Sequence, residues 1–393
     1  MKVALSTIGK FHTFDLARSL NSHGLLAGIC SGYPSFKLKN ERLPAELIHT
    51  FPWLHAPYMG MKRKEWLGNR ILRDWEYYDR VTLDRYAAAT LPSCDLFVGL
   101  SGSALITGRR AQQSGAHYLC DRGSTHIRTQ DQLLREEHAR WNQPYSGIDP
   151  RIIEREEAEY STADAISVPS QFNKISFLQA GIPAEKINVL PYGVDLTLFQ
   201  PTSVPSPHCF DVLFVGAMSL RKGVPDLLAA FKRLQHPRKT LTFAGSWSSE
   251  FIAAMRKLEL WNDDIVVLGH VPQRDLKNLM SRAHVMLLPS IEEGLALVQA
   301  QAMACGCPVI ATHNTGADDL YEDGCHGYIV PIRRPDLLTD RMQALADQTQ
   351  LRDQMANQAL NRVRQAGGWE QYGAAAISLY RRLTSNVTST KQQ

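Results

Sequence analysis

Residues 285–316 read VMLLPSIEEGLALVQAQAMACGCPVIATHNTG, and this stretch decides the fold. Val285–Leu288 is a short apolar run ended by a Pro-Ser pair, which is typical of a buried strand. Residues 295–305 are rich in helix formers, and the Gly-Cys-Pro at 306–308 stops the helix before a second apolar run at 309–312. The pattern predicts a strand, a helix and a second strand.

Polar groups gather where the predicted helix begins. Two adjacent carboxylates, Glu292 and Glu293, precede Gly294, and Gln301 lies eight residues after Glu293. In an α-helix that spacing corresponds to roughly 12 Å along the axis and about 80° around it. Because the unpaired N–H groups and the dipole of a helix N-terminus favour an anion, one side of this helix can hold a sugar hydroxyl, a diphosphate and a ribose in turn.

The segment resembles the retaining glycosyltransferases of family 4, whose motif is Glu-x7-Glu followed by Ala-Met-Ala-Cys-Gly. This chain has Glu293, seven residues, Gln301 and then the same five residues up to Gly306. The resemblance implies that Glu293 holds hydroxyls of the donor sugar and that residue 301 holds the nucleotide ribose. The family has a second glutamate where this chain has Gln301, which is neutral and has one acceptor oxygen fewer.

The chain divides into two halves that begin with the same sequence pattern. Residues 1–6 and 210–215 are each a predicted strand that runs into a Gly-containing turn and a helix, the start of a doubly wound α/β domain. Residues 200–209 are rich in Pro and Ser and predict a linker. The sequence thus predicts a first domain over 1–199 and a second over 210–368.

The resemblance implies that these are two Rossmann-like domains facing each other across a cleft, the GT-B architecture. In that architecture a terminal helix, here within residues 369–393, returns to complete the first domain. The segment 151–161 predicts a charged helix, and we expect most of its carboxylates on a solvated face. Those carboxylates belong to Glu154, Glu156, Glu157 and Glu159.

The turn after the opening strand of the second domain is a predicted phosphate site. Residues 216–223 read GAMSLRKG, similar to the family's Gly-Arg-x-x-x-x-Lys-Gly turn. The resemblance gives Lys222 the role of neutralising the departing diphosphate, with Arg221 replacing the family's arginine, which falls on Ala217. A solvated pair at a helix start is the alternative for Arg221 and Lys222.

Two further strand ends flank the nucleotide base in this family, and here they carry Gly245 and His270. A structural role is the alternative for His270, as for most lone histidines. The full predicted donor-binding set is Gly216, Ser219, Arg221, Lys222, Gly245, His270, Glu293, Gly294, Leu295, Ala296, Leu297 and Gln301.

The first domain supplies the predicted acceptor side. Its polar loop 120–126 follows a predicted strand, and many family members place a histidine in a comparable loop against the donor sugar. His126 is the first choice for this role and His12 the second, while a hydrogen-bonded loop without chemistry is the alternative. The predicted catalytic residues are His126, Lys222 and Glu293, and the predicted acceptor-side residues are Gly9, His12, Asp121, Arg122 and Ser124.

The resemblance implies retaining transfer of a sugar from a UDP- or GDP-sugar to a hydroxyl, with an oxocarbenium-like transition state. The departing phosphate takes the acceptor's proton on the same face, while Lys222, Arg221 and the amides after Glu293 stabilise the leaving group. The expected acceptor is a glycan, a lipid-linked glycan or a small molecule, in polysaccharide or glycolipid assembly. No Asp-x-Asp segment occurs, so no metal and no cofactor beyond the nucleotide sugar is implied.

Other classes remain as alternatives. An epimerase or phosphorylase can share the architecture, and Gln301 and Ala217 keep open a nucleotide-sugar-binding protein without transferase activity. An oxidoreductase is disfavoured because no Gly-x-Gly-x-x-Gly follows either opening strand. The net charge of +4 is too small to indicate nucleic acid.

The sequence also bears on location. Seven cysteines without a Cys-x-x-Cys suit a reducing cytosol, and we interpret Cys305 and Cys307 as small buried residues and not as a metal pair. No signal-peptide core follows Lys2, and no apolar run approaches the length of a membrane span. We therefore expect a cytoplasmic protein.

Aromatic and basic side chains alternate irregularly within residues 51–80. This pattern suits peripheral contact with the anionic inner face of a membrane. A helical hairpin that packs its aromatic side chains on the first domain is the alternative. The residues concerned are Phe51, Trp53, Tyr58, Met59, Met61, Lys62, Arg63, Lys64, Trp66, Arg70, Arg73 and Trp75.

Membrane contact through residues 51–80 predicts that the protein co-sediments with liposomes containing anionic lipid. Its basic side chains are attracted to the negative surface, so neutral liposomes should bind it less and added salt should release it. Failure to sediment even with anionic lipid contradicts the membrane hypothesis.

Overall fold

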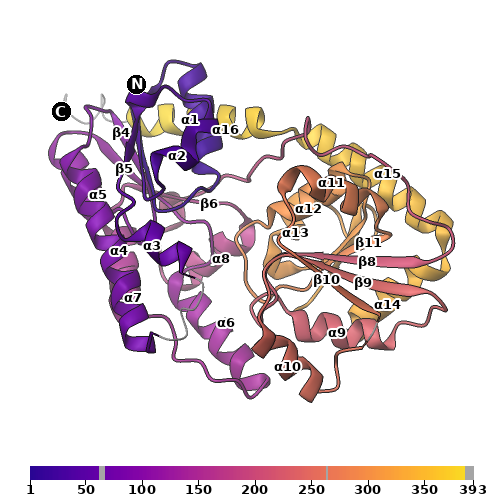
Figure 1. Cartoon of the computed structure of the whole chain (residues 1–393). Helices are drawn as coiled ribbons and strands as arrows, with labels where there is room; N and C mark the ends of the chain where they lie inside the picture. Colours follow the sequence, from indigo (N-terminus) through magenta and orange to yellow (C-terminus); the bar gives the residue numbers. More distant parts are fainter. Residues whose placement is uncertain (62–66, 263, 386–393) are drawn as a thin grey trace.

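A computed structural model describes residues 1–61, 67–262 and 264–385, and shows two α/β domains (Figure 1). The strands of the first domain are β1 (Val3–Thr7), β2 (Leu26–Ser31), β3 (Ile48–Thr50), β4 (Leu96–Leu100), β5 (His117–Asp121), β6 (Ala165–Val168) and β7 (Ile187–Val189). Its helices are α1 (Thr13–Ser22), α2 (Ser35–Leu38), α3 (His55–Gly60), α4 (Asn69–Ala89), α5 (Leu105–Gln113), α6 (Ile127–Arg140), α7 (Pro150–Thr162) and α8 (Gln171–Gln179).

The second domain follows the same alternation of strands and helices. Its strands are β8 (Phe210–Val215), β9 (Lys239–Ala244), β10 (Ile265–Gly269), β11 (Val285–Leu288), β12 (Val309–Thr312) and β13 (Gly327–Val330). Its helices are α9 (Val224–Arg233), α10 (Ser249–Lys257), α11 (Gln273–Arg282), α12 (Leu297–Ala304), α13 (Ala317–Leu320), α14 (Pro335–Asp347) and α15 (Thr349–Ala366).

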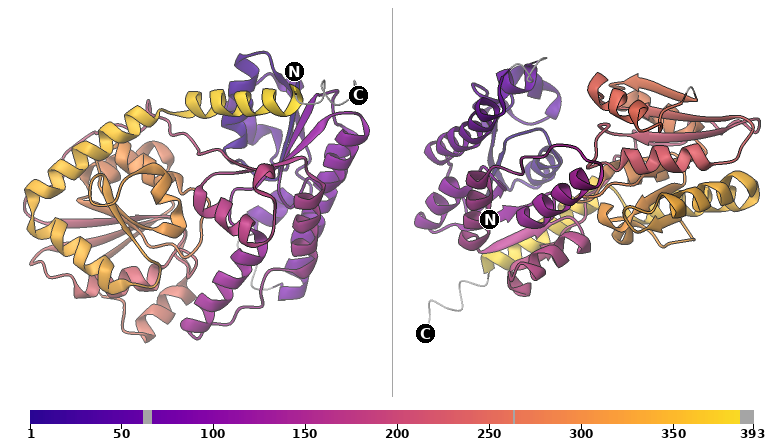
Figure 2. Two further views of the ribbon diagram at one scale, coloured as in Figure 1. Left: turned by 180° about the vertical axis from the view of Figure 1, so that it is seen from behind. Right: turned by 90° about the horizontal axis from the view of Figure 1, so that it is seen from below.

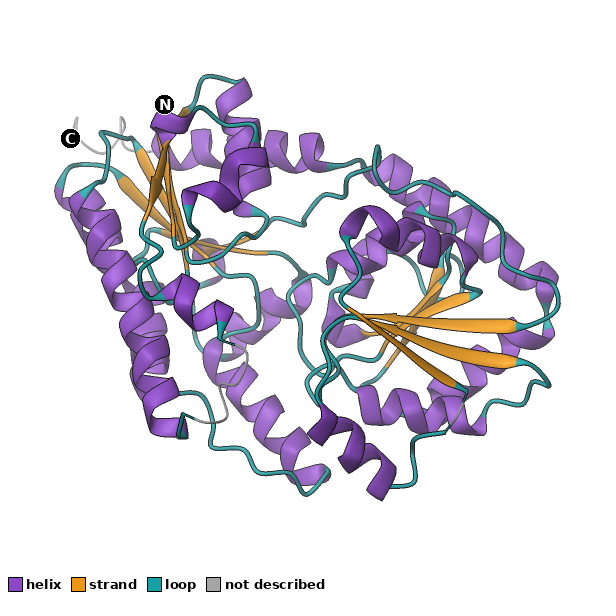
Figure 3. Ribbon diagram, viewed as in Figure 1, coloured by secondary structure: helices purple, strands orange, loops and turns teal. Residues whose placement is uncertain are grey.

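Each domain is built on one parallel sheet. The strand orders are β3-β2-β1-β4-β5-β6-β7 and β10-β9-β8-β11-β12-β13, so that the order reverses beside β1 in the first sheet and beside β8 in the second. Figure 3 shows helices on both faces of the sheets. This is the doubly wound arrangement, in which ligands bind at the carboxyl ends of the strands near the reversal. The predicted fold class of two Rossmann-like domains is confirmed.

The stretch that decided the fold forms the centre of the second sheet. Every residue of β11 and β12 is buried, as expected for parallel strands covered on both faces. The helix between them, α12, begins at Leu297, two residues later than the sequence predicts. Residues 293–296 therefore form an extended turn, which leaves the start of the helix accessible.

The last helix, α16 (Trp369–Ser385), leaves the second domain and packs on the first (Figure 2). Its side chains Tyr372, Ile377 and Tyr380 are buried in the first domain's core, next to α1. The two helices approach so closely that a Cβ on Gly373 would lie 1.9 Å from Ser19 Oγ. Figure 1 shows the N-terminus beside this helix.

The expectation for the glutamates of α7 is wrong for two of the four. Glu156 and Glu159 are 2% and 0% exposed, since α7 lies beneath the loops that follow β4 and β5. Glu159 accepts hydrogen bonds from the backbone N–H groups of Gly102 and Ala104, and burial raises its pKa to about 8. Glu156 forms a 2.7 Å ion pair with Arg122. These carboxylates support the loops of the predicted site.

Substitution of Gly373 by alanine should weaken the contact between α16 and α1. The added Cβ overlaps Ser19, and overpacking of this kind costs about 1–3 kcal/mol, so the melting temperature should fall. Gly60→Ala is the control, because a Cβ there has no neighbour within 4 Å. Equal melting temperatures for Gly373→Ala and the control would contradict tight docking of α16.

Candidate active site

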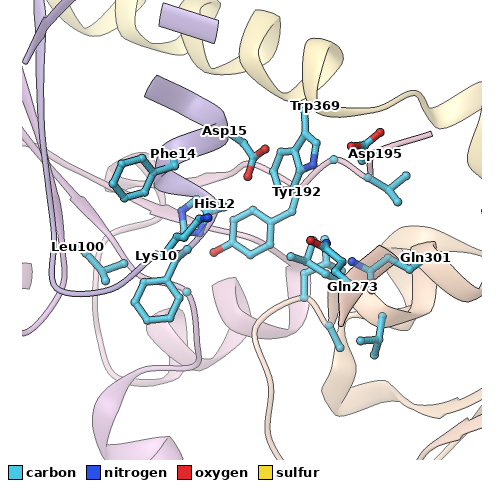
Figure 4. Close-up of a pocket in the computed structure, with 18 of the residues that line it drawn as sticks. Lys10, His12, Phe14, Asp15, Leu100, Tyr192, Asp195, Gln273, Gln301 and Trp369 are labelled. Atoms are coloured by element: carbon cyan, nitrogen blue, oxygen red, sulfur yellow. The ribbon is translucent and has the colours of Figure 1, made fainter. Parts of the chain in front are cut away.

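A cavity of about 870 Å³ lies between the domains, at the carboxyl ends of the strands of both sheets (Figure 4). The predicted site residues that line it are His12, Arg122, Ser124, Lys222, Glu293, Leu295, Ala296, Leu297 and Gln301. The structure therefore brings the donor side and the acceptor side of the predicted site together in one space.

The start of α12 faces this cavity. Leu297 and Val298 line the cavity, and within the described chain their backbone N–H groups have no hydrogen-bond partner. Unpaired N–H groups and the positive end of the helix dipole attract an anion. Figure 4 shows Gln301 of α12 and Gln273 of α11 among the side chains that line the same space.

Two cations of the β8–α9 turn pair with two carboxylates of the β11–α12 turn. Lys222 forms an ion pair with Glu293. The Arg221 guanidinium lies 3.0 Å from the Glu292 carboxylate and 3.9 Å from that of Glu293. Burial would lower the pKa of Arg221, but these two carboxylates raise it. The pair is therefore not simply solvated: both cations are held at the start of α12.

Glu292 joins the two domains, a role that the sequence did not indicate. Its side chain is fully buried and accepts hydrogen bonds from Ser124 Oγ (2.5 Å), Thr125 Oγ1 (2.8 Å) and Gln130 Nε2 (3.0 Å), all in the first domain. Burial acts to raise the pKa of Glu292, but Arg221 and the hydrogen bonds outweigh it and lower the pKa to about 2. The carboxylate is therefore charged at neutral pH.

The histidine of the cavity is His12 and not His126. His12 Nε2 lies 2.6 Å from Asp121 Oδ2, and its ring stacks on Tyr192 at 4.2 Å between centroids. His126 caps α6, is absent from the cavity lining and packs its ring near Tyr160. Burial lowers the pKa of His126 to about 4. The geometry therefore favours the second choice, His12, over His126 for the predicted role.

The remaining predicted residues are not part of the cavity lining. Arg221 lies beside Glu292 and Glu293, and Asp121 lies beside His12. Ser219 accepts a hydrogen bond from the Lys222 backbone N–H. A Cβ on Gly294 would lie 2.1 Å from the Gly123 carbonyl oxygen, so this glycine permits the close approach of the two domains. The other predicted residues outside the lining are Gly9, Gly216, Gly245 and His270.

The first-domain side of the cavity holds residues that the sequence did not single out. Arg18 donates a 2.7 Å hydrogen bond to Glu41 and also pairs with Asp15, and Lys10 pairs with Glu41. Trp369 of α16 and Asp15 of α1 line the same cavity (Figure 4). The three-residue spacing of Asp15 and Arg18 on one helix face is a signal that could have indicated this pair from the sequence. Glu41 and Trp369 come from distant segments, and no motif indicates them.

One cluster in the described chain has the composition of a metal site. Ligand atoms of Glu322, Cys325 and His326 lie within 4.8 Å of one another, away from the cavity lining. The Glu322 backbone N–H donates to His326 Nδ1 at 3.3 Å, which leaves the proton of a neutral ring on Nε2.

Within residues 51–80, the segment considered for membrane contact, some aromatic and apolar side chains are exposed and others contact the first domain. Trp53 and Met59 are 73% and 55% exposed. Phe51 instead stacks on Tyr86, and Trp75 Nε1–H donates to the Leu54 carbonyl oxygen. The contacts of Phe51 and Trp75 fit the alternative, a helical hairpin that packs on the first domain. Lys62, Arg63, Lys64 and Trp66 lie outside the described residues.

Among solved structures, sucrose-phosphate synthase from Thermosynechococcus elongatus is similar, with a TM-score of 0.74 and 19% identity over 98% of this chain and 100% of that one. Anabaena HepE in complex with UDP and glucose has a TM-score of 0.71 and 18% identity, covering 97% of this chain and 100% of that one. The fold is that of the GT-B glycosyltransferases.

Sequence comparison agrees. Residues 206–362 match the family model "Glycosyl transferases group 1". D-inositol 3-phosphate glycosyltransferase of Paenarthrobacter aurescens is 28% identical over 62% of this chain and 64% of its own length. The putative colanic acid biosynthesis glycosyltransferase WcaL of Escherichia coli is 29% identical over 42% of this chain and 43% of its own length. The chain thus matches between 43% and 64% of the length of these relatives. The resemblance to the GT-B glycosyltransferases of family 4 is confirmed.

Within residues 1–61, 67–262 and 264–385, every helix is too short or too polar to cross a membrane.

Replacement of Glu292 by glutamine should loosen the contact between the domains. Because the folded-state pKa of about 2 lies below the ordinary 4.5, this carboxylate stabilises the fold above about pH 4.5, and its contribution is lost as the pH falls toward 2. Glu292→Gln should therefore lower stability by about 1–3 kcal/mol at pH 7, and by progressively less in acid.

Thermal melts of wild type and Glu292→Gln between pH 7 and pH 3 measure this difference. Glu185→Gln, at an exposed position, is the matched control and should melt like wild type. A difference that stays constant with pH, or is absent at pH 7, would contradict the role of the Glu292 carboxylate.

Proposed function

We propose that the protein is a retaining hexosyltransferase that moves a sugar from a UDP- or GDP-sugar to a hydroxyl group. One observation carries the proposal: Lys222 and Arg221 meet Glu293 beside the open N-terminus of α12, inside a cavity between two Rossmann-like domains. Cations and free amides suit a diphosphate, and a carboxylate suits sugar hydroxyls. The family resemblance supports retention of the anomeric configuration.

The donor's diphosphate would replace the glutamates as the partner of the two cations. Lys222 and Arg221 then stabilise the charge that develops on the diphosphate as the bond to the sugar breaks. Released from Lys222, the Glu293 carboxylate accepts hydrogen bonds from the sugar. Gln301 holds the nucleotide ribose through its amide, and the HepE complex with UDP and glucose supports a nucleotide in this type of cleft.

The acceptor would enter from the first-domain side, past His12 and the Arg18–Glu41 network. Relatives named for D-inositol 3-phosphate and for colanic acid support an acceptor from polysaccharide or glycoconjugate assembly. We place this reaction in the cytoplasm without a metal cofactor, and the exposed Trp53 and Met59 support peripheral membrane contact. A nucleotide-sugar-binding protein without transferase activity is the second candidate, favoured by the neutral Gln301.

A panel of nucleotides and nucleotide sugars should raise the melting temperature selectively, because a ligand that binds only the native state stabilises it. UDP or GDP and their sugars should shift it, and NAD should not. No shift with any nucleotide diphosphate would contradict the proposed donor site. Binding without turnover of any donor would favour the second candidate.

Lys222→Ala should lower the transfer rate by at least about a hundredfold, the effect of removing one group that stabilises developing charge. Lys257→Ala, on the exposed end of α10, is the matched control and should leave the rate unchanged. Near-normal turnover by Lys222→Ala would remove this residue from the mechanism.

A further inference from the structure

We infer that helix α6 acts as a clasp, which aligns the β8–α9 turn carrying Arg221 and Lys222 with the first domain. The inference rests on the proposed function, because that proposal gives this turn the donor diphosphate. Helix α6 belongs to the first domain and extends towards the second (Figure 1). Side chains at both of its ends contact the second domain, and each contact lies next to the cationic turn.

The start of α6 is connected to the first cation of the turn. Gln130, in the first turn of the helix, donates a 3.0 Å hydrogen bond to Glu292 Oε2. The same oxygen accepts a 3.0 Å hydrogen bond from Arg221 Nε. On its other side, Gln130 Oε1 accepts a hydrogen bond from Arg122 Nη2 at 2.9 Å, which fixes the orientation of the amide. One carboxylate oxygen therefore joins α6 to Arg221.

The end of α6 is connected to the helix that follows the second cation. Arg140, the last residue of α6, donates two 2.7 Å hydrogen bonds to the two carboxylate oxygens of Asp226. Asp226 is buried in the first turn of α9, four residues after Lys222. Two parallel hydrogen bonds fix the orientation of the partners as well as their distance. Gln130 and Arg140 are roughly 15 Å apart along the helix, so α6 is attached on both sides of the cationic turn.

A second ion pair between the domains reinforces the end of α6. Glu137 is 0% exposed and accepts hydrogen bonds from Trp141 Nε1 at 2.6 Å and from Arg333 Nε at 2.8 Å. Arg333 belongs to the second domain, in the loop between β13 and α14. Its backbone has a φ of 61°, in the left-handed region that residues other than glycine rarely adopt. We call the four side chains Glu137, Arg140, Asp226 and Arg333 the clasp.

The clasp acts through position. In the described chain its four side chains are not among those that line the cavity, so they do not touch the donor or the acceptor. The cationic turn is also fixed within its own domain, since a Cβ on Gly223 would lie 1.9 Å from the Pro289 carbonyl oxygen. The turn therefore moves with the second domain as one unit, and the clasp sets where that unit lies against the first. Misplacement of reacting groups by about 1 Å can cost a hundredfold in rate.

The kinetic test compares Arg140→Ala and Arg140→Lys with the matched control Arg128→Ala, using the donor that thermal shift identifies. Arg128 lies on the same helix but pairs with Glu157 of the first domain, so its loss should leave transfer unchanged. In Arg140→Ala, kcat should fall about 10- to 100-fold. UDP or GDP should still bind as in wild type, because the groups proposed to hold it lie in the second domain. Arg140→Lys keeps the charge but not the paired hydrogen bonds, so it should recover part of the rate.

Small-angle X-ray scattering measures the clasp without any substrate. The double variant Arg140→Ala, Arg333→Ala should have a larger radius of gyration than wild type and Arg128→Ala, because both ion pairs at the end of α6 are lost. A radius equal to that of wild type would overturn the inference. So would a wild-type kcat in Arg140→Ala, or an equal loss of rate and of nucleotide affinity. A wild type that neither binds a nucleotide diphosphate nor transfers a sugar would instead contradict the proposed function.

Discussion

One buried carboxylate holds the two halves of the site in place. Glu292 belongs to the second domain, yet three of its hydrogen bonds come from Ser124, Thr125 and Gln130 of the first. Its negative charge is balanced by Arg221 within its own domain. Since a buried charge is tolerated only when it is paired and hydrogen-bonded, the domain contact and the position of Arg221 depend on each other.

Further contacts extend this connection to the donor site. Asn173 and Ser170 of the first domain donate to the carbonyl oxygens of Glu293 and Gly294, at 3.0 and 2.9 Å. At the other end of the interface, Arg140 of α6 makes two 2.7 Å hydrogen bonds to the buried Asp226 of α9. The turn that carries Glu293 is thereby fixed from both domains, so the predicted donor and acceptor groups face each other across one cavity.

The sequence predicted the parts of this site that depend on local pattern. Strands β11 and β12 have the predicted bounds, because short apolar runs were flanked by Pro and Gly. Lys222 and Glu293 come together because each follows a strand at the same edge of one parallel sheet. The family resemblance supplied the roles of these residues, and the structure supplied their pairing.

Tertiary contacts decided the rest. Glu292 and Glu293 are neighbours in the chain, and no pattern shows that one joins the domains while the other lines the cavity. Likewise, His12 and His126 are both polar residues near strand ends, and only tertiary structure distinguishes them: His12 lines the cavity, whereas His126 packs near Tyr160. The buried glutamates of α7 were expected in solvent because their partners are loop amides and Arg122, which lie far away in sequence.

The most direct measurement is a crystal structure of the protein with the nucleotide diphosphate that it binds. In such a complex the diphosphate should take the place of the glutamates as the partner of Lys222 and Arg221. We expect the β-phosphate within hydrogen-bond distance of Lys222 and of the backbone N–H groups at the start of α12, with the ribose beside Gln301. A nucleotide bound elsewhere, with the Lys222–Glu293 pair intact, would contradict it.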